Sequence, residues 1–345
     1  MKIHTHTEWD PLKEVIIGRA TGAQVPTVKD ESLHAVNYGD KSYEDFSAAP
    51  SGPYPDRLIK EADEDLDMFA EALEELGIKV YRPKIGDFSE RFRTDDWEVD
   101  GYYGYCPRDS VLTIGNQAIE TPMVLRHRQN EAERLFSHIF DSQIVRAPRP
   151  RLLDSMYDRS QLGRPTLRND EPAFDAANCL KFGRDVLYLV SNTGNEAGAQ
   201  WLRDHLGSDY RIHPVRDVYA YIHIDSTLTL LRPGLVLLCP ARVTSEDKIP
   251  ECLRTWEKIW CPDPDPVPAL EEWGGASKWI AMNMLSLSPD LVAVEKSQVK
   301  LMRLLEQHGI DCLPVQLRHT RTLGGGPHCI SLDLVREGTL EDYVS

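Results

Sequence analysis

Short apolar runs bounded by turn residues recur along the chain, and such runs predict buried β-strands. The runs lie at residues 14–18, 110–114, 185–190, 234–238 and 291–294. Most of them are followed by a stretch with helical periodicity, of which residues 66–76 are the clearest case. A second short strand is expected after each such stretch, and these strands centre near Val80, Val145, Ile212, Trp260 and Leu313.

This order predicts an α/β fold built from five units of strand, helix and strand. Radial repetition of such units, closed on itself, hides the edges of the sheets from solvent. A generic open α/β sheet is the alternative interpretation of the same pattern. Because none of the polar segments has the character of an interdomain linker, residues 1–345 are expected to form a single domain. The polar segment at residues 27–53 is expected to be a long surface loop or lid.

The composition mainly excludes certain partners and locations for the protein. The 345 residues include 39 Lys and Arg against 55 Asp and Glu, so the formal net charge is −16. Nucleic acids and anionic membranes require a basic face, so neither is an expected partner of this acidic chain. The sequence has no apolar run long enough to span a membrane, and its start has no apolar signal segment. A cytoplasmic protein is therefore expected.

The seven cysteines are an odd, scattered set without a Cys-x-x-Cys pair. Such a set is a poor disulfide framework and a poor zinc site, so reduced thiols are expected. The glycine patterns of P-loops and of dinucleotide-binding folds are also missing from the sequence. The sequence therefore offers no motif for a metal or another cofactor.

The strongest chemical feature is the stretch Thr322-Leu-Gly-Gly-Gly-Pro-His-Cys329. Its glycines allow the backbone to approach a ligand closely, and Cys329 begins an alternating, strand-like run. A cysteine in this position is well placed to act as a nucleophile. The alternative is a buried cysteine that packs as a small hydrophobic side chain.

Four polar residues near other apolar runs could support such a nucleophile. In a strand, His223 and Asp225 would point to one face, where such a pair is costly unless it is paired or used. Asp175 lies among Phe and Ala residues, and Asp109 precedes the apolar run at residues 111–114. A thiolate nucleophile needs a base and a group that orients the base. The alternatives are a structural histidine and aspartates that only form turns or caps.

Taken together, these motifs resemble the amidinotransferase family of the pentein superfamily. The motifs are Glu171-Pro-Ala-Phe-Asp-Ala-Ala, His223-Ile-Asp, Ser277-Lys-Trp with Met282-Asn, and Leu323-Gly-Gly-Gly-Pro-His-Cys. The resemblance extends over nearly the whole chain, from about residue 8 to residue 340. It is closest to the inosamine-phosphate amidinotransferases of streptomycin pathways and includes the lysine amidinotransferase of phaseolotoxin synthesis.

The resemblance implies a pentein fold, which is a fivefold α/β propeller of ββαβ-type units around a central active-site channel. It also implies transfer of an amidino group from L-arginine to an amine, with release of L-ornithine and without a metal or other cofactor. By resemblance, Cys329 is the nucleophile, His223 the acid and base, and Asp175 the partner of His223. Asp109 and Asp225 match the carboxylates that hold the guanidinium, and Arg242 and Ser277 match contacts of the substrate carboxylate. Family members are commonly homodimers, so a homodimer is expected.

The residue types suit this chemistry. Two carboxylates can clamp a guanidinium and fix its carbon for attack. Attack by the Cys329 thiolate gives an amidino-cysteine, which the acceptor amine then attacks. Water must be excluded while this intermediate exists, and residues 27–53 are the candidate lid.

The acceptor remains open at this stage. Tyr219 and Tyr221 depart from the animal glycine enzymes and imply a different acceptor pocket, so glycine is not the expected acceptor. Ala276 stands where those enzymes have a serine, so one contact with arginine is not expected to be kept. Pro327 also departs from the family, where an aromatic residue is common, without changing the expected role of Cys329. A lysine-like amine and an inosamine phosphate are both compatible with the sequence. A phosphate would need a basic cluster, and no such cluster stands out, which favours the lysine-like amine.

Three other functions are compatible with the same residues. The first is an arginine deiminase-type hydrolase on the same scaffold, in which water replaces the amine. The second is a metal-binding protein that uses His223, Asp225, His328 and Cys329. The third is a binding protein without catalytic activity.

Overall fold

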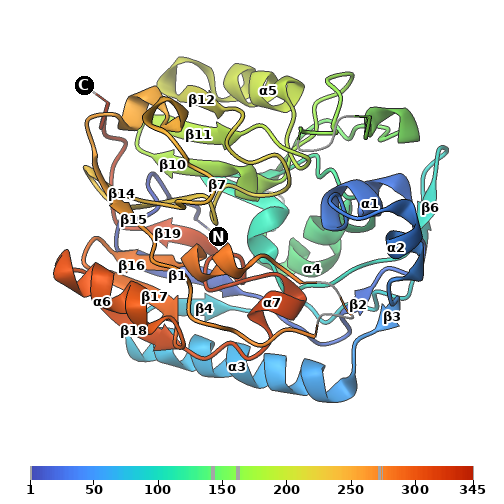
Figure 1. The fold of residues 1–345 in the computed structure, drawn as a ribbon, viewed down its shortest axis with the longest axis horizontal. Helices are drawn as coiled ribbons and strands as arrows, with labels where there is room; N and C mark the ends of the chain where they lie inside the picture. The colour runs from blue at the N-terminus through green and yellow to red at the C-terminus, as the bar shows by residue number, and fades with distance from the viewer. Residues whose placement is uncertain (1, 141–143, 161–163, 271–272, 274, 345) are drawn as a thin grey trace.

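The computed structural model describes residues 2–140, 144–160, 164–270, 273 and 275–344. Within these residues the structure contains five three-stranded sheets that share one topology (Figure 1). In each sheet the middle strand is antiparallel to one neighbour and parallel to the other. We call the antiparallel neighbour the inner strand, because its residues are mostly buried, and the parallel neighbour the outer strand, because it is partly exposed.

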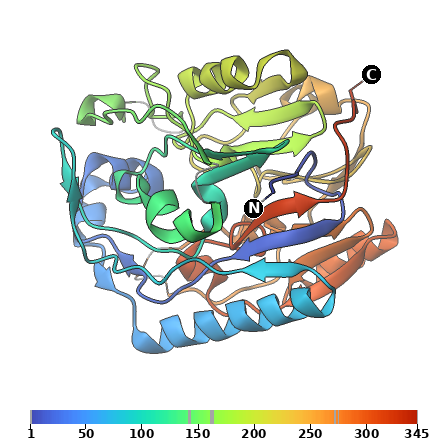
Figure 2. The ribbon, with the colours of Figure 1, turned by 180° about the vertical axis from the view of Figure 1, so that it is seen from behind.

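In the order inner, middle and outer, the sheets are β19 (Ser331–Arg336), β1 (Leu12–Ile17) and β4 (Lys79–Tyr81); β7 (Val111–Ile114), β8 (Gln117–Glu120) and β9 (Ile144–Arg146); β10 (Cys179–Phe182), β11 (Asp185–Leu189) and β12 (Arg211–Val215); β13 (Leu228–Arg232), β14 (Leu235–Leu238) and β15 (Glu257–Trp260); and β16 (Leu285–Ser288), β17 (Leu291–Glu295) and β18 (Asp311–Val315). The first sheet joins the two ends of the chain, and Figure 2 shows the N-terminal and C-terminal strands side by side.

Four of the five sheets connect the middle strand to the outer strand through a helix. These helices are α3 (Asp56–Glu75), α4 (Glu131–Phe140), α5 (Glu196–Leu206) and α6 (Val299–Gln307). Each buries one apolar face, as the helical periodicity predicts. The fourth sheet instead uses two short 3₁₀ turns, at Glu246–Lys248 and Glu251–Leu253.

The apolar pattern predicted two strands for each unit, whereas each sheet has three. The runs at 14–18, 185–190, 234–238 and 291–294 are middle strands, and the run at 110–114 is an inner strand. Most inner strands escaped detection because they bury polar side chains that interrupt an apolar run. Lys181 on β10 and Ser286 on β16 are examples. The inner strand β19 was recognised, because it lies in the alternating run that begins at Cys329. The outer strands lie where the pattern predicted them.

The predicted loop at residues 27–53 is more ordered than the sequence suggested. It contains α1 (Glu31–Asn37) and α2 (Tyr43–Ala48), and β3 (Gly52–Pro53) at its end pairs with β2 (Gln24–Val25). The Asp30 and Ser42 side chains cap the two helices. Helices this short have too few turns to show a clear apolar period. Figure 1 shows α1 and α2 at the right of the molecule.

The remaining elements are the hairpin of β5 (Phe92–Arg93) and β6 (Glu98–Val99) and the short helix α7 (Thr320–Leu323), which precedes Cys329. No helix in the described part of the chain is long and apolar enough to cross a membrane. All seven cysteines lie within the described residues and are free thiols.

Candidate active site

Each inner strand is preceded by a loop that carries one or two of the polar residues of the site. Asp109 precedes β7, Asp175 precedes β10, His223 and Asp225 precede β13, Asn283 precedes β16, and Cys329 precedes β19. Since the five sheets share one topology, these loops occupy equivalent positions in the units. The fold therefore gathers residues that are far apart in the sequence.

His223 and Asp225 do not lie on a strand, contrary to the prediction from alternation. His223 is in a loop and Asp225 is in a turn before β13. The aliphatic residues around them suggested a strand, but β13 begins only at Leu228. Their side chains nevertheless approach the same residue, because Asp225 accepts a hydrogen bond from Cys329 and His223 also contacts that thiol.

Cys329 is buried in a turn two residues before β19 and is held by two neighbours. Its Sγ lies 3.1 Å from Asn283 Nδ2 and 3.4 Å from Asp225 Oδ2. Its backbone N–H donates to Asn283 Oδ1 at 2.9 Å. Asn283 therefore fixes both the main chain and the thiol of Cys329.

His223 is partly buried and lies between two carboxylates. Its Nε2 lies 3.0 Å from Asp175 Oδ2, and its Nδ1 lies 3.6 Å from Asp109 Oδ1. The other oxygen of Asp175 accepts from the backbone N–H of Val124 at 3.1 Å, which fixes the carboxylate. One ligand-type atom from each of Asp109, His223 and Cys329 lies within 4.8 Å of the others.

The charges around this group set its protonation. Burial lowers the pKa of His223, but Asp109, the hydrogen bond from Asp175 and the contact with Cys329 outweigh it and raise the pKa well above the usual value. The neighbouring Cys106 thiol, burial and the charge of Asp225 together raise the pKa of Cys329 well above its usual value, although His223 acts in the opposite direction. At neutral pH the free site therefore holds a protonated imidazole and a protonated thiol.

The two carboxylates predicted to hold a guanidinium lie in different environments. Asp109 accepts from Arg128 at 2.5 Å through Oδ2, while its Oδ1 is buried and receives no hydrogen bond from the described residues. Asp225 accepts from His328 Nδ1 at 2.8 Å. Burial raises the pKa of Asp225, but His328 outweighs burial and lowers it to about 2. An ionised Asp225 and an unsatisfied oxygen on Asp109 are suited to binding a cation.

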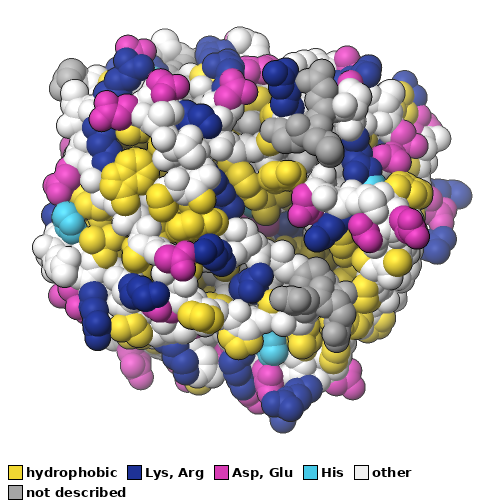
Figure 3. Space-filling model, viewed as in Figure 1, with side chains coloured by type: hydrophobic (Ala, Val, Ile, Leu, Met, Phe, Trp, Pro, Cys, Tyr) yellow, Lys and Arg dark blue, Asp and Glu magenta, His cyan; other side chains and the backbone are white. Residues whose placement is uncertain are grey.

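A cavity of about 130 Å³ opens beside this group. Asp109, Asp175 and His223 line it, together with residues of α1 and the aromatic side chains of Tyr102 and Trp273. Figure 3 shows the hollow near the middle of this face of the molecule. The lining combines the carboxylates of Asp109 and Asp175 with apolar side chains and with Arg128, which is already paired with Asp109 and Glu131. Carboxylates among apolar walls suit a small organic cation.

Arg242 and Ser277 do not line this cavity. Arg242 Nη1 donates to the Ser226 hydroxyl at 2.7 Å, and its guanidinium lies 3.6 Å from the ring centre of Tyr219. Ser277 is exposed, and its hydroxyl accepts from Trp279 N at 3.3 Å at the start of the turn Lys278–Met282. Their predicted contacts with a substrate carboxylate stay predictions.

Sequence reasoning gave no role to three residues that shape the site. Asn283 entered only through a motif of the resemblance, Arg128 was not singled out, and His328 appeared only as a candidate metal ligand. Arg128 binds both Asp109 and Glu131, and it is buried. An arginine in a polar stretch carries no signal for such a contact, because the partner is identified only by the fold.

Among the described residues, Asp109, His223 and Cys329 form a group that could hold a metal ion, since carboxylate, imidazole and thiolate are zinc ligands.

No family model matches the chain, but comparisons with known proteins find amidinotransferases among its relatives. The sequence is 47% identical to inosamine-phosphate amidinotransferase 1 of Streptomyces glaucescens over 346 aligned residues, which cover 99% of each chain. The solved structure of the inosamine-phosphate amidinotransferase of Streptomyces griseus superposes with a TM-score of 0.94 at 47% identity over 99% of each chain. An amidinotransferase of the saxitoxin biosynthetic pathway from Microseira wollei gives a TM-score of 0.89 at 34% identity, also over 99% of each chain.

A more distant likeness concerns the fold alone. The N-terminal domain of a cyanobacterial arginine dihydrolase has a TM-score of 0.63 at 13% identity and covers 95% of this chain and 98% of that domain. These likenesses confirm the mixed α/β architecture of pentein proteins.

Proposed function

Because the chain belongs to the amidinotransferase family, we propose that it moves the amidino group of L-arginine to an acceptor amine and releases L-ornithine. The observation that carries this proposal is the approach of Cys329, His223 and Asp109, whose reactive atoms lie within 4.8 Å of one another beside the cavity. The reaction needs a nucleophile, an acid and a carboxylate that binds the guanidinium.

In the first half-reaction, the guanidinium of arginine binds between Asp109 and Asp225. Its positive charge favours ionisation of Cys329, whose pKa is otherwise raised. The thiolate attacks the guanidinium carbon and forms a C–S bond. His223 then protonates the departing nitrogen, the C–N bond breaks, and ornithine leaves while the amidino group stays on the sulfur.

In the second half-reaction, the acceptor amine enters the same cavity. His223, now neutral, takes a proton from the amine as its nitrogen attacks the amidino carbon. The C–S bond breaks, and Cys329 and His223 return to their starting states once the thiolate has regained its proton. The proposed sequence needs no metal or other cofactor. The thiol proton of Cys329 leaves to solvent when arginine binds and returns from solvent at the end, and every other proton and electron pair passes between the side chains and the two substrates.

Water competes with the amine for the amidino-cysteine. We assign the role of lid to residues 27–53, since α1 supplies Leu33, Val36 and Asn37 to the cavity wall. A transferase benefits from such cover, because hydrolysis of the intermediate would waste the amidino group.

The acceptor in this proposal is an inosamine phosphate or a lysine-like amine. The strong likeness to two inosamine-phosphate amidinotransferases favours the first, whereas the lack of an evident basic cluster in the sequence favoured the second. Tyr219 and Tyr221, which were expected to shape the acceptor pocket, do not line the cavity. Either acceptor is compatible with a role in antibiotic or toxin biosynthesis, the context in which the saxitoxin-pathway relative is named.

The likeness to the family supports four further points of the proposal. The five sheets close into a fivefold propeller around a central channel, residues 1–345 act as one domain, the enzyme is a homodimer, and it works in the cytoplasm.

The test is to incubate the protein with L-arginine and a panel of amines and to measure ornithine and citrulline. We expect ornithine release to require an amine, and the peptide that contains Cys329 to gain the mass of one amidino group when arginine is supplied alone. Cys312→Ala is the matched control, because Cys312 lies on β18 away from the cavity. Citrulline formation without an amine requirement would identify a hydrolase, and an unmodified Cys329 would exclude the covalent route.

A further inference from the structure

The turn between β11 and α5, residues 191–195, is buried and holds the backbone of Asp175 (Figure 1). The carbonyl oxygen of Thr193 accepts from the backbone N–H of Asp175 at 2.8 Å, and the N–H of Asn195 donates to the carbonyl oxygen of Ala173 at 3.0 Å. The segment that ends in Asp175 is therefore paired with this turn. The turn fixes the main chain of the residue that orients His223.

Asn192 connects the same turn to the loop that carries His223. Its backbone N–H donates to the carbonyl oxygens of Ala220 and Tyr221, at 2.8 and 2.9 Å. Tyr221 precedes His223 by two residues. One turn therefore holds the main chain on both sides of the Asp175–His223 pair, whose side chains meet at 3.0 Å.

The side chain of Asn192 reaches in the other direction, to α1. Its Nδ2 donates to the carbonyl oxygen of Ala35 at 2.9 Å, and its Oδ1 accepts from the backbone N–H and the hydroxyl of Thr166, at 2.8 and 3.2 Å. Ala35 lies in the last turn of α1, where carbonyl oxygens lack partners within the helix. Both Ala35 and Asn192 are buried, so water does not replace this hydrogen bond. Asn192 therefore caps the end of α1 from the body of the protein.

Gly39, just beyond α1, makes this close approach possible. A Cβ atom at Gly39 would lie 2.8 Å from the carbonyl oxygen of Ala35, 3.1 Å from Asn192 Nδ2 and 3.4 Å from Tyr221 Cδ1. The first distance is too short for a carbon atom and the second is tight. Gly39 is not among the glycines with positive φ, so the lack of a side chain, rather than an unusual backbone conformation, is what this position requires.

We propose that Asn192 is a positioning residue that docks α1 onto the turn holding Asp175 and His223, so that the wall that excludes water and the acid–base pair are fixed to one support. The proposal rests on the proposed function in treating α1 as part of the lid and Cys329 as the carrier of the amidino group. Because α1 forms part of the cavity wall, its release would admit water beside Cys329. Asn192 therefore controls the lifetime of the amidino-cysteine rather than its formation.

The test separates these two steps. The full chain is incubated with L-arginine and desalted, and the amidino group on the Cys329 peptide is followed by mass spectrometry in buffer without an amine. In the hydrolysis that this measures, the oxygen of water attacks the amidino carbon, the C–S bond breaks, the sulfur regains a proton and urea leaves. The rate at which arginine first modifies Cys329 is measured separately.

Asn192→Leu retains a side chain of similar volume but removes the donor to Ala35. We expect the amidino group to be lost about tenfold faster than in the wild-type protein, because water gains access, while the rate of modification by arginine changes less than about twofold. Gly39→Ala disturbs the same contact from the side of α1 and should also speed the loss. Since both variants break one contact, the double variant should lose the group no faster than Asn192→Leu.

Thr166→Val is the matched control. It removes the hydroxyl that contacts Asn192 Oδ1 but keeps the backbone N–H of residue 166 and the contact with α1. Hydrogen exchange of the peptide that contains α1, without substrates, provides a second measurement. Exchange should be faster in Asn192→Leu and Gly39→Ala and unchanged in Thr166→Val, because local opening determines its rate.

A general structural role for Asn192 predicts a different result. It would slow modification by arginine and transfer to the amine together and leave the lifetime of the amidino-cysteine unchanged, and this result would overturn the proposal, as would an equally short lifetime in Thr166→Val. If Asn192→Leu does not fold, as judged by thermal unfolding, Gly39→Ala decides. The exchange measurement needs no turnover, so unchanged exchange overturns the docking of α1 even if the wild-type protein forms no amidino-cysteine, a failure that would instead contradict the proposed function.

Discussion

Asp175 Oδ2 lies 3.0 Å from His223 Nε2, and this pair determines which nitrogen of the histidine can exchange protons with a substrate. Because Asp175 occupies Nε2, the nitrogen that faces Asp109 and the reacting atoms is Nδ1. Asp175 also accepts from the backbone N–H of Val124, so the carboxylate cannot rotate away without losing a buried hydrogen bond. The ring of His223 is therefore oriented before any substrate binds.

We expect Asp175→Asn to lower kcat by about a hundredfold or more, because an acid–base group contributes on this scale. The change should also alter the pH profile. Burial lowers the pKa of His223, while Asp109 and Asp175 together hold it well above the usual value, so His223 loses its proton only as the pH rises through that raised pKa. Without the charge of Asp175, the alkaline limb of kcat/KM should move to lower pH.

Steady-state kinetics from pH 6 to 10 measure both effects. Asp158→Asn serves as the control, since Asp158 is partly exposed, pairs with Arg168 at 3.3 Å and does not line the cavity. A variant Asp175→Asn with normal kcat and an unchanged profile would show that His223 is not the acid and base.

Asn283 gives a second prediction, because it contacts both the thiol and the backbone N–H of Cys329. Asn283→Leu leaves that buried N–H without a partner, which costs about 1–3 kcal/mol. We expect a lower melting temperature and about a tenfold lower kcat. Asn283→Asp keeps the acceptor for the N–H but adds a negative charge beside Sγ, so alkylation of Cys329 by iodoacetamide should slow. Unchanged alkylation in Asn283→Asp would show that this contact does not influence the thiol.

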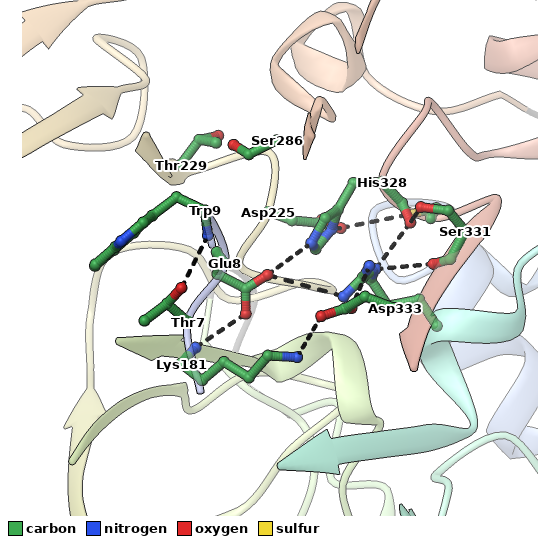
Figure 4. Close-up of polar contacts among 12 residues, drawn as sticks. Thr7, Glu8, Trp9, Lys181, Asp225, Thr229, Ser286, His328, Ser331 and Asp333 are labelled. Atoms are coloured by element: carbon green, nitrogen blue, oxygen red, sulfur yellow. Dashed lines mark hydrogen bonds and ion pairs between the residues drawn. The ribbon is translucent and has the colours of Figure 1, made fainter. Parts of the chain in front are cut away.

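The sequence could predict the features of this site that are formed by neighbouring residues, but not the contacts between residues that are far apart in the chain. Cys329 and its glycine loop are adjacent in the sequence, so their chemistry could be recognised locally. The pairing of Asp175 with His223, which are 48 residues apart, came from the resemblance to the family, because no local rule brings two distant loops together. The strand predicted at His223 was wrong because aliphatic residues in a buried loop imitate a strand. The inner strand β10 was missed for the opposite reason, since Lys181 is charged yet buried, and its pairing with Asp333 is a contact that only the tertiary structure provides (Figure 4).

Arg242 allows a test of a residue whose role the geometry does not assign. Its guanidinium is buried against Tyr219 and Ser226 rather than lining the cavity. If it binds the carboxylate of arginine, Arg242→Ala should raise KM for arginine about tenfold with little change in kcat. Arg254→Ala, an exposed substitution, is the control. A lower melting temperature with an unchanged KM would assign Arg242 a purely structural role.

Acid conditions should destabilise the protein through the buried carboxylates of Glu8 and Asp225. The pKa values of Glu8 and Asp225 are about 2 in the folded state, below their ordinary values of 4.5 and 3.8. A carboxyl with a depressed pKa contributes stability above its unfolded pKa and loses it as the pH falls through the folded value. The melting temperature should therefore fall between about pH 5 and pH 2. Glu8→Gln should be less stable at pH 6 and show a shallower fall, and thermal unfolding across this range measures both.

The cap of α1 offers a test of the proposed lid. Asp30 Oδ1 accepts from Leu33 N at 2.8 Å, and Oδ2 accepts from Arg126 Nη1 at 2.9 Å, so one side chain both caps α1 and ties it to the body of the protein. Losing the cap alone costs about 1 kcal/mol. We expect Asp30→Ala to loosen the wall of the cavity and to let water compete with the amine.

The measurement for Asp30→Ala is the ratio of urea to transfer product at a fixed amine concentration, which should rise several-fold. Ser42→Ala is the matched control, because Ser42 caps the neighbouring helix α2, accepts from Asp45 N at 3.0 Å and is exposed. The two variants lose the same kind of cap, but only α1 lines the cavity. An equal rise in both variants would point to general loosening, and no rise in either would mean that something other than α1 excludes water from the amidino-cysteine.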